Sequence, residues 1–126
     1  MKLAARESWP CKCGKLLYTA PEILIATGDS PAFDPLKLDV WALGIMLFIL
    51  LIGRPPWPVQ TGPTLRNACF QYVCLGKLEK LLKAWKVDLS PPAVDLLRNL
   101  LELEPDDRPT LAEVRQFPWF SGGNNL

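Results

Sequence analysis

The sequence predicts an all-α fold built around one buried, apolar helix. Residues 40–52 read Val-Trp-Ala-Leu-Gly-Ile-Met-Leu-Phe-Ile-Leu-Leu-Ile, so this segment is apolar on every side. In the segments 64–75 and 91–103 apolar residues recur with helical spacing, and no segment gives a convincing strand pattern. The chain has 126 residues, 49% of them hydrophobic. That is enough for one domain, or a piece of a larger one, with a buried core.

The central helix is expected over about residues 38–52. It ends at Gly53, because the Arg-Pro-Pro-Trp-Pro sequence that follows cannot continue a helix. A membrane-spanning helix needs about 20 apolar residues, and the apolar run is shorter than that. We therefore expect a core helix of a globular domain and no membrane span.

The segments before the central helix read as loops and one short helix. Residues 1–19 show little periodicity and are expected to form a loop. A short helix is expected over residues 21–26, with Pro21 in its first turn. Residues 27–35 (Thr-Gly-Asp-Ser-Pro-Ala-Phe-Asp-Pro) are a turn-rich connector.

Two helical segments are expected directly after the central helix. A helix over residues 64–75 would end at Gly76, followed by a short basic helical stretch over residues 77–85. The first of these helices shows the spacing of a single buried face, formed by Leu65, Ala68, Cys69, Tyr72 and Val73.

The C-terminal helices carry clear start signals. Ser90 followed by Pro91 opens a helix that runs to about residue 103, with Val94, Leu97 and Leu101 on one stripe. After a break at residues 104–107, Thr110 and Glu113 have capping-box spacing and start a last helix to about residue 117. Residues 121–126 (Ser-Gly-Gly-Asn-Asn-Leu) are expected to be a disordered tail.

Composition excludes several classes of function. Fourteen basic and 13 acidic residues give a net charge of +1, which offers no electrostatic case for binding nucleic acid or a membrane surface. Histidine is absent, which removes the commonest general base and the commonest metal ligand.

The four cysteines favour a reducing compartment. Cys11, Cys13, Cys69 and Cys74 could be read as a zinc site, but structural zinc usually uses tighter pairs, often with histidine. Two disulfides are the other alternative, but the N-terminus lacks the apolar core of a secretory signal. We expect reduced, partly buried thiols in a cytoplasmic protein, with no metal.

Three short sequence motifs, in this order along the chain, indicate more than a generic helical fold. They are Tyr-Thr-Ala-Pro-Glu at residues 18–22, Asp-Val-Trp-Ala-Leu-Gly at 39–44, and Asp-Arg-Pro-Thr at 107–110. Together they resemble the lower half of a eukaryotic protein kinase domain of the Ser/Thr type. The resemblance covers nearly the whole chain and implies the helical C-lobe portion of that fold, a partial kinase domain over residues 1–120.

The resemblance implies two structural roles. Glu22 and Arg108 match the family's buried ion pair, which fixes the activation segment to the last helices. Bidentate geometry explains why the cation would be arginine. Asp39 matches the carboxylate that accepts backbone N–H groups of the catalytic loop. Its position also suits an acidic residue at a helix N-terminus, and both interpretations can hold at once.

It also implies two recognition surfaces. Leu16 and Thr19 match positions that line the pocket for the substrate residue after the phosphorylated one; the alternative is that both are plain loop residues. The helix over residues 64–75, with the preceding Pro-Pro-Trp, matches a surface that docks protein substrates or regulators, with Trp57, Leu65 and Tyr72 as its contacts. Core packing of Trp57 is an equal alternative.

The parts that would carry out phosphoryl transfer are missing from this sequence. No glycine-rich loop, no Val-Ala-Ile-Lys strand, no His-Arg-Asp string and no Asp-Phe-Gly string occurs. The complete parent domain is expected to use Mg-ATP to phosphorylate Ser or Thr of proteins. The chain alone is expected to bind no cofactor and to have no catalytic residues. The family pattern also differs at Lys15, where Thr is usual, and at Ile49, where some members have Glu.

Three interpretations remain open at this stage. The chain is a fragment of a Ser/Thr protein kinase, a non-catalytic kinase-like binding module that uses the surface of residues 57–76, or an unrelated small helical protein. Because the central helix is apolar all round and its usual cover is absent, the isolated chain is expected to expose an apolar patch. It should then be marginally stable and either associate with a partner, such as the missing kinase half, or aggregate.

Overall fold

A computed structural model describes residues 16–121, with side chains to residue 120. The described residues form helices and turns, with no strand among them. The all-α prediction is therefore confirmed over this part of the chain. The predicted loop of residues 1–15 and most of the predicted disordered tail lie outside it.

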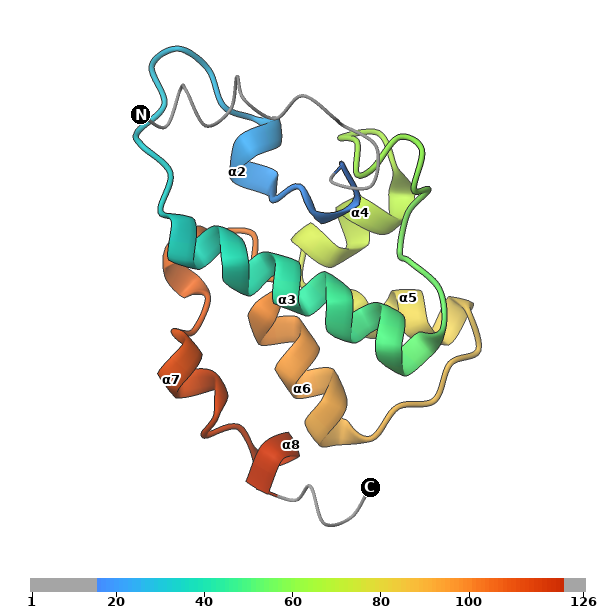
Figure 1. Cartoon of the computed structure of the whole chain (residues 1–126). Helices are drawn as coiled ribbons and strands as arrows, with labels where there is room; N and C mark the ends of the chain where they lie inside the picture. Colours follow the sequence, from blue (N-terminus) through green and yellow to red (C-terminus); the bar gives the residue numbers. More distant parts are fainter. Residues whose placement is uncertain (1–15, 122–126) are drawn as a thin grey trace.

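The central helix, α3 (Pro35–Ile52), crosses the middle of the molecule (Figure 1). It begins three residues earlier than predicted. Asp34 is its N-cap, with the side chain accepting a hydrogen bond from the Leu36 N–H at 3.0 Å, and Pro35 occupies the first helical position. Gly53, with φ 94°, ends it as predicted.

Because α3 is longer than predicted, its length no longer argues against a membrane-spanning helix. Within the described residues, α3 is the one helix that is long and apolar enough to cross a membrane, so length alone does not exclude a span. However, one of its faces is packed as in the core of a globular domain: Val40, Trp41, Ile45 and Phe48 are at most 1% exposed.

The helix α6 (Pro91–Leu100) packs across α3 (Figure 1). Ser90 caps it as predicted, its hydroxyl accepting from the Ala93 N–H at 3.3 Å, but it ends three residues before the predicted end. At the crossing, a Cβ added to Gly44 would lie 2.6 Å from Leu101 Cδ2, so this close approach requires glycine.

The helix α4 (Ala68–Cys74) lies on the side of α3 opposite α6, and α5 (Leu78–Ala84) contacts both α4 and α6 (Figure 1). The predicted start of α4 at residue 64 is wrong, because Asn67 caps the helix by accepting from the Phe70 N–H at 2.9 Å. The predicted buried face is also wrong in most positions. Phe70 and Val73 are buried, whereas Leu65 lies outside the helix and is 56% exposed.

The remaining elements are short. They are the 3₁₀ helices η1 (Leu16–Tyr18) and η2 (Pro105–Asp107), α2 (Pro21–Leu24), α7 (Leu111–Val114) and α8 (Pro118–Ser121). The predicted capping box at α7 is present, since Thr110 and Glu113 each bond the other's backbone N–H. The last helix ends at Val114 rather than near residue 117, because Phe117-Pro118 starts a separate turn of helix.

Candidate functional site

A buried arginine links the first and last thirds of the described chain. Arg108 Nη2 lies 2.7 Å from Glu22 Oε1, and Nη1 lies 2.8 Å from Glu22 Oε2, so the pair is bidentate. The arginine side chain is 0% exposed and the glutamate side chain 15%. The ion pair predicted between these residues is therefore present, with the geometry that distinguishes arginine from lysine.

All five N–H groups of the Arg108 guanidinium have an acceptor. The carbonyl oxygens of Glu102, Lys37 and Leu103 accept the three that Glu22 does not, at 2.9, 3.0 and 3.3 Å. Lys37 Nζ in turn donates to the Arg108 carbonyl at 2.6 Å. The pair thus joins α2, the start of α3 and the α6–η2 connection with no donor left unsatisfied, which is the condition for a buried charge to be tolerated.

The segment expected to line the substrate pocket is held in place by contacts with Trp57 and Gly62. The Trp57 indole N–H donates to the Leu17 carbonyl at 3.1 Å, and Leu17 is 6% exposed. Gly62, with φ 65°, approaches so closely that an added Cβ would lie 2.4 Å from the Leu16 carbonyl oxygen. Leu16 and Thr19 remain half-buried on either side of these contacts. Residue spacing alone did not predict this contact between residues 16–17 and 57–62.

Trp57 belongs to the core and not to a docking surface. It is 3% exposed, stacks on Trp41 with ring centroids 6.4 Å apart, and meets Phe70 edge-on at 5.3 Å. Of the two interpretations left open for this residue, core packing is the one the structure supports. The prediction that Trp57 is an exposed docking residue is wrong, because a ring packed between two other aromatic rings is not available to a partner.

The other two residues of the expected docking surface are accessible. Leu65 is 56% exposed and Tyr72 is 39% exposed, and the neighbouring Leu75 is 65% exposed. The surface of residues 57–76 thus retains an apolar side, formed by α4 and the loop before it.

One face of α3 is uncovered. Leu36, Met46 and Leu50 are 64%, 48% and 78% exposed, and they lie on the same side of the helix as Asp39 and the half-buried Leu43. We call these five residues the α3 stripe. The apolar patch expected from the sequence is present, and Asp39 lies within it, exposed to solvent.

The described thiols are free. Burial raises the pKa of Cys74 from 9.0 to about 11, an effect that Arg108 partly opposes. Burial also raises the pKa of Cys69, partly opposed by Arg54. Within residues 16–121 no group of three His, Cys, Asp or Glu side chains could hold a metal ion. Cys11 and Cys13 lie outside the described residues.

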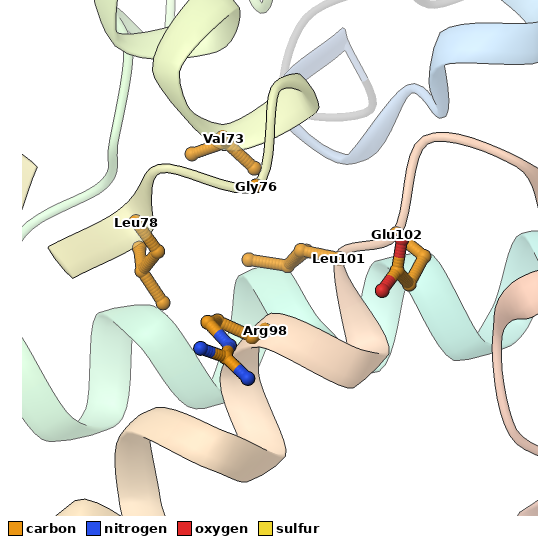
Figure 2. Close-up of a pocket in the computed structure, with 6 residues that line it drawn as sticks. All are labelled: Val73, Gly76, Leu78, Arg98, Leu101 and Glu102. Atoms are coloured by element: carbon orange, nitrogen blue, oxygen red, sulfur yellow. The ribbon is translucent and has the colours of Figure 1, made fainter.

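A small cavity of about 150 Å³ lies between the turn after α4 and α6 (Figure 2). Figure 2 shows Leu101 directed toward the space between Val73 and Leu78. Arg98, which also lines the cavity, donates a hydrogen bond to Glu79 at 3.1 Å. Ligand pockets typically measure about 300–1,000 Å³, so this cavity is too small for an organic ligand.

Comparisons with known proteins identify the family. The family model "Protein kinase domain" matches residues 2–120. The serine/threonine-protein kinase DCLK3 of Mus musculus is 39% identical over 107 residues, covering 85% of this chain and 12% of that protein. Calcium-dependent protein kinase 34 of Arabidopsis thaliana is 35% identical over 106 residues, covering 84% of this chain and 18% of that protein.

Solved structures of kinase domains also match this chain. The crystal structure of the Rad53 kinase domain and SCD2 in complex with AMPPNP aligns with a TM-score of 0.58 and 26% identity, covering 84% of this chain and 38% of that chain. This chain therefore spans only a small part of its curated relatives and little more than a third of the Rad53 chain. The described helices correspond to a C-lobe fragment, and the chain belongs to the protein kinase domain family.

Proposed function

We propose that this chain is the C-lobe part of a Ser/Thr protein kinase domain whose complete form transfers the γ-phosphate of Mg-ATP to Ser or Thr of a protein in the cytoplasm. The chain alone binds no nucleotide and transfers no phosphate. The observation that carries this proposal is the α3 stripe, in which the carboxylate of Asp39 lies among exposed apolar side chains. Such a face suits a second packed layer that also supplies hydrogen-bond donors.

The physical argument concerns what Asp39 requires once it is covered. A carboxylate buried without donors costs several kcal/mol or more, so any segment that covers Leu36, Met46 and Leu50 must present N–H groups to it. In the family, the catalytic loop supplies such groups to the aspartate at this position. We therefore assign Asp39 as the catalytic-loop anchor of the complete domain.

The rest of the site supports the same assignment. The Glu22–Arg108 pair places the end of the activation segment against the last helices. Contacts of Trp57 and Gly62 with residues 16–17 support the segment that carries Leu16 and Thr19. In the complete domain, Leu16 and Thr19 line the pocket for the substrate residue after the phosphorylated Ser or Thr. Phosphoryl transfer depends mainly on such positioning, with charge neutralisation by metal and lysine from the missing half.

A chimera tests the proposal. The upstream part of the mouse DCLK3 kinase domain would be joined to residue 14 of this chain, and phosphate transfer from radiolabelled ATP to casein would be measured. We expect transfer to Ser and Thr by the chimera and none by the 126-residue chain. Transfer by the isolated chain would refute the proposal. So would a chimera that unfolds cooperatively, as complete domains do, and yet is inactive.

A second candidate function is a non-catalytic binding module, favoured by the exposure of Leu65, Tyr72 and Leu75. The size of the native protein separates the two candidates. An antibody against residues 77–92 would detect a band near 14.1 kDa if the chain acts alone. It would detect a band of at least about twice that mass if a complete domain is made.

A further inference from the structure

We propose that a groove between the α2–α3 loop and η2 binds a basic peptide segment, with a cationic side chain next to an apolar one. The groove has a volume of about 380 Å³, within the range of about 300–1,000 Å³ that is usual for ligand sites. Its walls come from the two segments that the Glu22–Arg108 pair holds together. We call it the α2/η2 groove.

The apolar part of the groove comes from both walls. Ile25, at the end of α2, is 56% exposed, and Pro31, Ala32 and Phe33 continue along the loop. Pro105 faces them from η2. Three of these residues are prolines or alanine, which lose little or no side-chain entropy when a partner covers them. The groove can therefore bury an apolar side chain at low entropic cost.

All the charged side chains that line the groove are acidic. Glu22, Asp34, Glu104 and Asp106 line it, and no lysine or arginine does. The nearest cations are already engaged: Arg108 is bound by Glu22, and Lys37 Nζ donates to the Arg108 carbonyl. Among the described residues, Glu104 and Asp106 have no ion pair. A cationic partner is therefore favoured, and an acidic one is repelled.

Local hydrogen bonds keep both walls in place. The Thr27 N–H donates to Ser30 Oγ at 2.8 Å, and the Leu36 N–H donates to Asp34 Oδ1 at 3.0 Å. On the other wall, the Asp107 N–H donates to the Glu104 carbonyl at 3.1 Å or less, closing η2. Because the walls are held before binding, a partner does not have to order them.

The occupant is a peptide rather than a small cation, because the carboxylates are distributed around an apolar surface. The carboxylates of Glu22 and Asp34 are also occupied by Arg108 and by the α3 N-terminus. Glu104 and Asp106 remain to bind the cationic side chain, and Ile25 and Pro105 to contact the apolar one. The inference rests on the lining of this groove and does not depend on the proposed function.

The test uses the whole chain and three labelled peptides. Fluorescence anisotropy would follow binding of Arg-Leu-Ala-Arg-Leu-Gly, of its acidic counterpart with Glu for Arg, and of a polar counterpart with Ser for Leu. We expect the first peptide to bind at least about tenfold more tightly than either counterpart. Its affinity should fall as salt is raised, since exposed charges are screened.

Two variants locate the site. Glu104→Lys and Asp106→Lys change exposed residues and should each weaken binding of the basic peptide by about tenfold. Asp88→Lys, an equal change of charge at an exposed residue outside the groove, is the matched control and should change affinity by less than about twofold. Tryptophan fluorescence would verify that all three remain folded.

Several results would overturn the assignment. They are equal binding of the basic and acidic peptides, no binding at about 1 mM peptide, or equal loss of affinity in the groove and control variants. Self-association of the chain that weakens in Glu104→Lys would identify a second copy as the occupant and would equally overturn it.

Discussion

Two sides of α3 differ in how completely they are surrounded. Near its start, Arg108 is buried and every N–H of its guanidinium is bound. Along the α3 stripe, Met46 and Leu50 are 48% and 78% exposed and contact water. The first region is a complete polar network, and the second is an exposed apolar face. The difference shows which groups the described residues satisfy among themselves and which they leave to solvent.

The largest effect is expected from breaking the ion pair on one side. Arg108→Leu strands the Glu22 carboxylate, and we expect the free energy of unfolding to fall by about 3–5 kcal/mol. Urea unfolding followed by tryptophan fluorescence measures it. Arg98→Leu is the control: its pair with Glu79 has side chains 42% and 57% exposed, so its removal should cost at most about 1 kcal/mol. If both variants lost the same free energy of unfolding, the buried pair would be no more important for stability than the exposed one.

The next effect concerns the crossing of α3 and α6. Gly44→Ala places a methyl group against Leu101, and we expect a loss of about 1–3 kcal/mol in urea unfolding. Gly28→Ala is the matched control, since an added Cβ there meets nothing within 4 Å. A tolerated Gly44→Ala would mean that the two helices can separate, and that the core is looser than its packing indicates.

A smaller effect depends on pH. The pKa of Cys74 is raised by burial from 9.0 to about 11, so the folded state keeps the thiol protonated where the unfolded state ionises it. The stability this provides is complete below about pH 9 and is lost as the pH rises toward about 11. Unfolding of Cys74→Ala between these values should therefore depend less on pH than unfolding of the parent. Parallel curves for the two proteins would show that the thiol is solvated.

The smallest effect on stability is expected on the α3 stripe. Leu50→Gln should change the free energy of unfolding by no more than about 0.5 kcal/mol, because the side chain is already in water. It should nevertheless reduce self-association in sedimentation velocity, since it interrupts the exposed apolar patch. Phe48→Gln, two residues away in the core, is the opposite case and should unfold the chain. If Leu50→Gln leaves self-association unchanged, the chain associates through a surface other than the α3 stripe.

The order of the helices α2 to α7 could be predicted from the sequence, because proline, glycine and capping residues act locally, whereas η1, η2 and α8 were not predicted. The same logic failed where a cap was misread as a turn. Asp34-Pro35 starts α3 in the same way that Ser90-Pro91 starts α6, yet it was assigned to the connector. Asn67 starts α4, so the periodicity that placed Leu65 on a buried face did not apply.

The site was only partly predictable, because its contacts join distant residues. Glu22 and Arg108 are 86 positions apart, and only their place in the family motifs predicted that they meet. No local pattern showed that Trp57 bonds Leu17, 40 positions away, or that Gly62 lies against Leu16. The α2/η2 groove was missed for the same reason, since its two walls come from residues 22–34 and 104–106, which are far apart in the sequence.

The hydrogen bond from Trp57 to Leu17 has a consequence for how the chain unfolds. The indole is fixed between Trp41 and Phe70, so the 3₁₀ turn at Leu16–Tyr18 is attached to the centre of the core rather than to the surface. Opening of this turn must break the hydrogen bond from Trp57, so we expect the Trp57 indole N–H to exchange its proton slowly. The segment expected to meet substrate is thereby coupled to the core, although it lies near the start of the described chain.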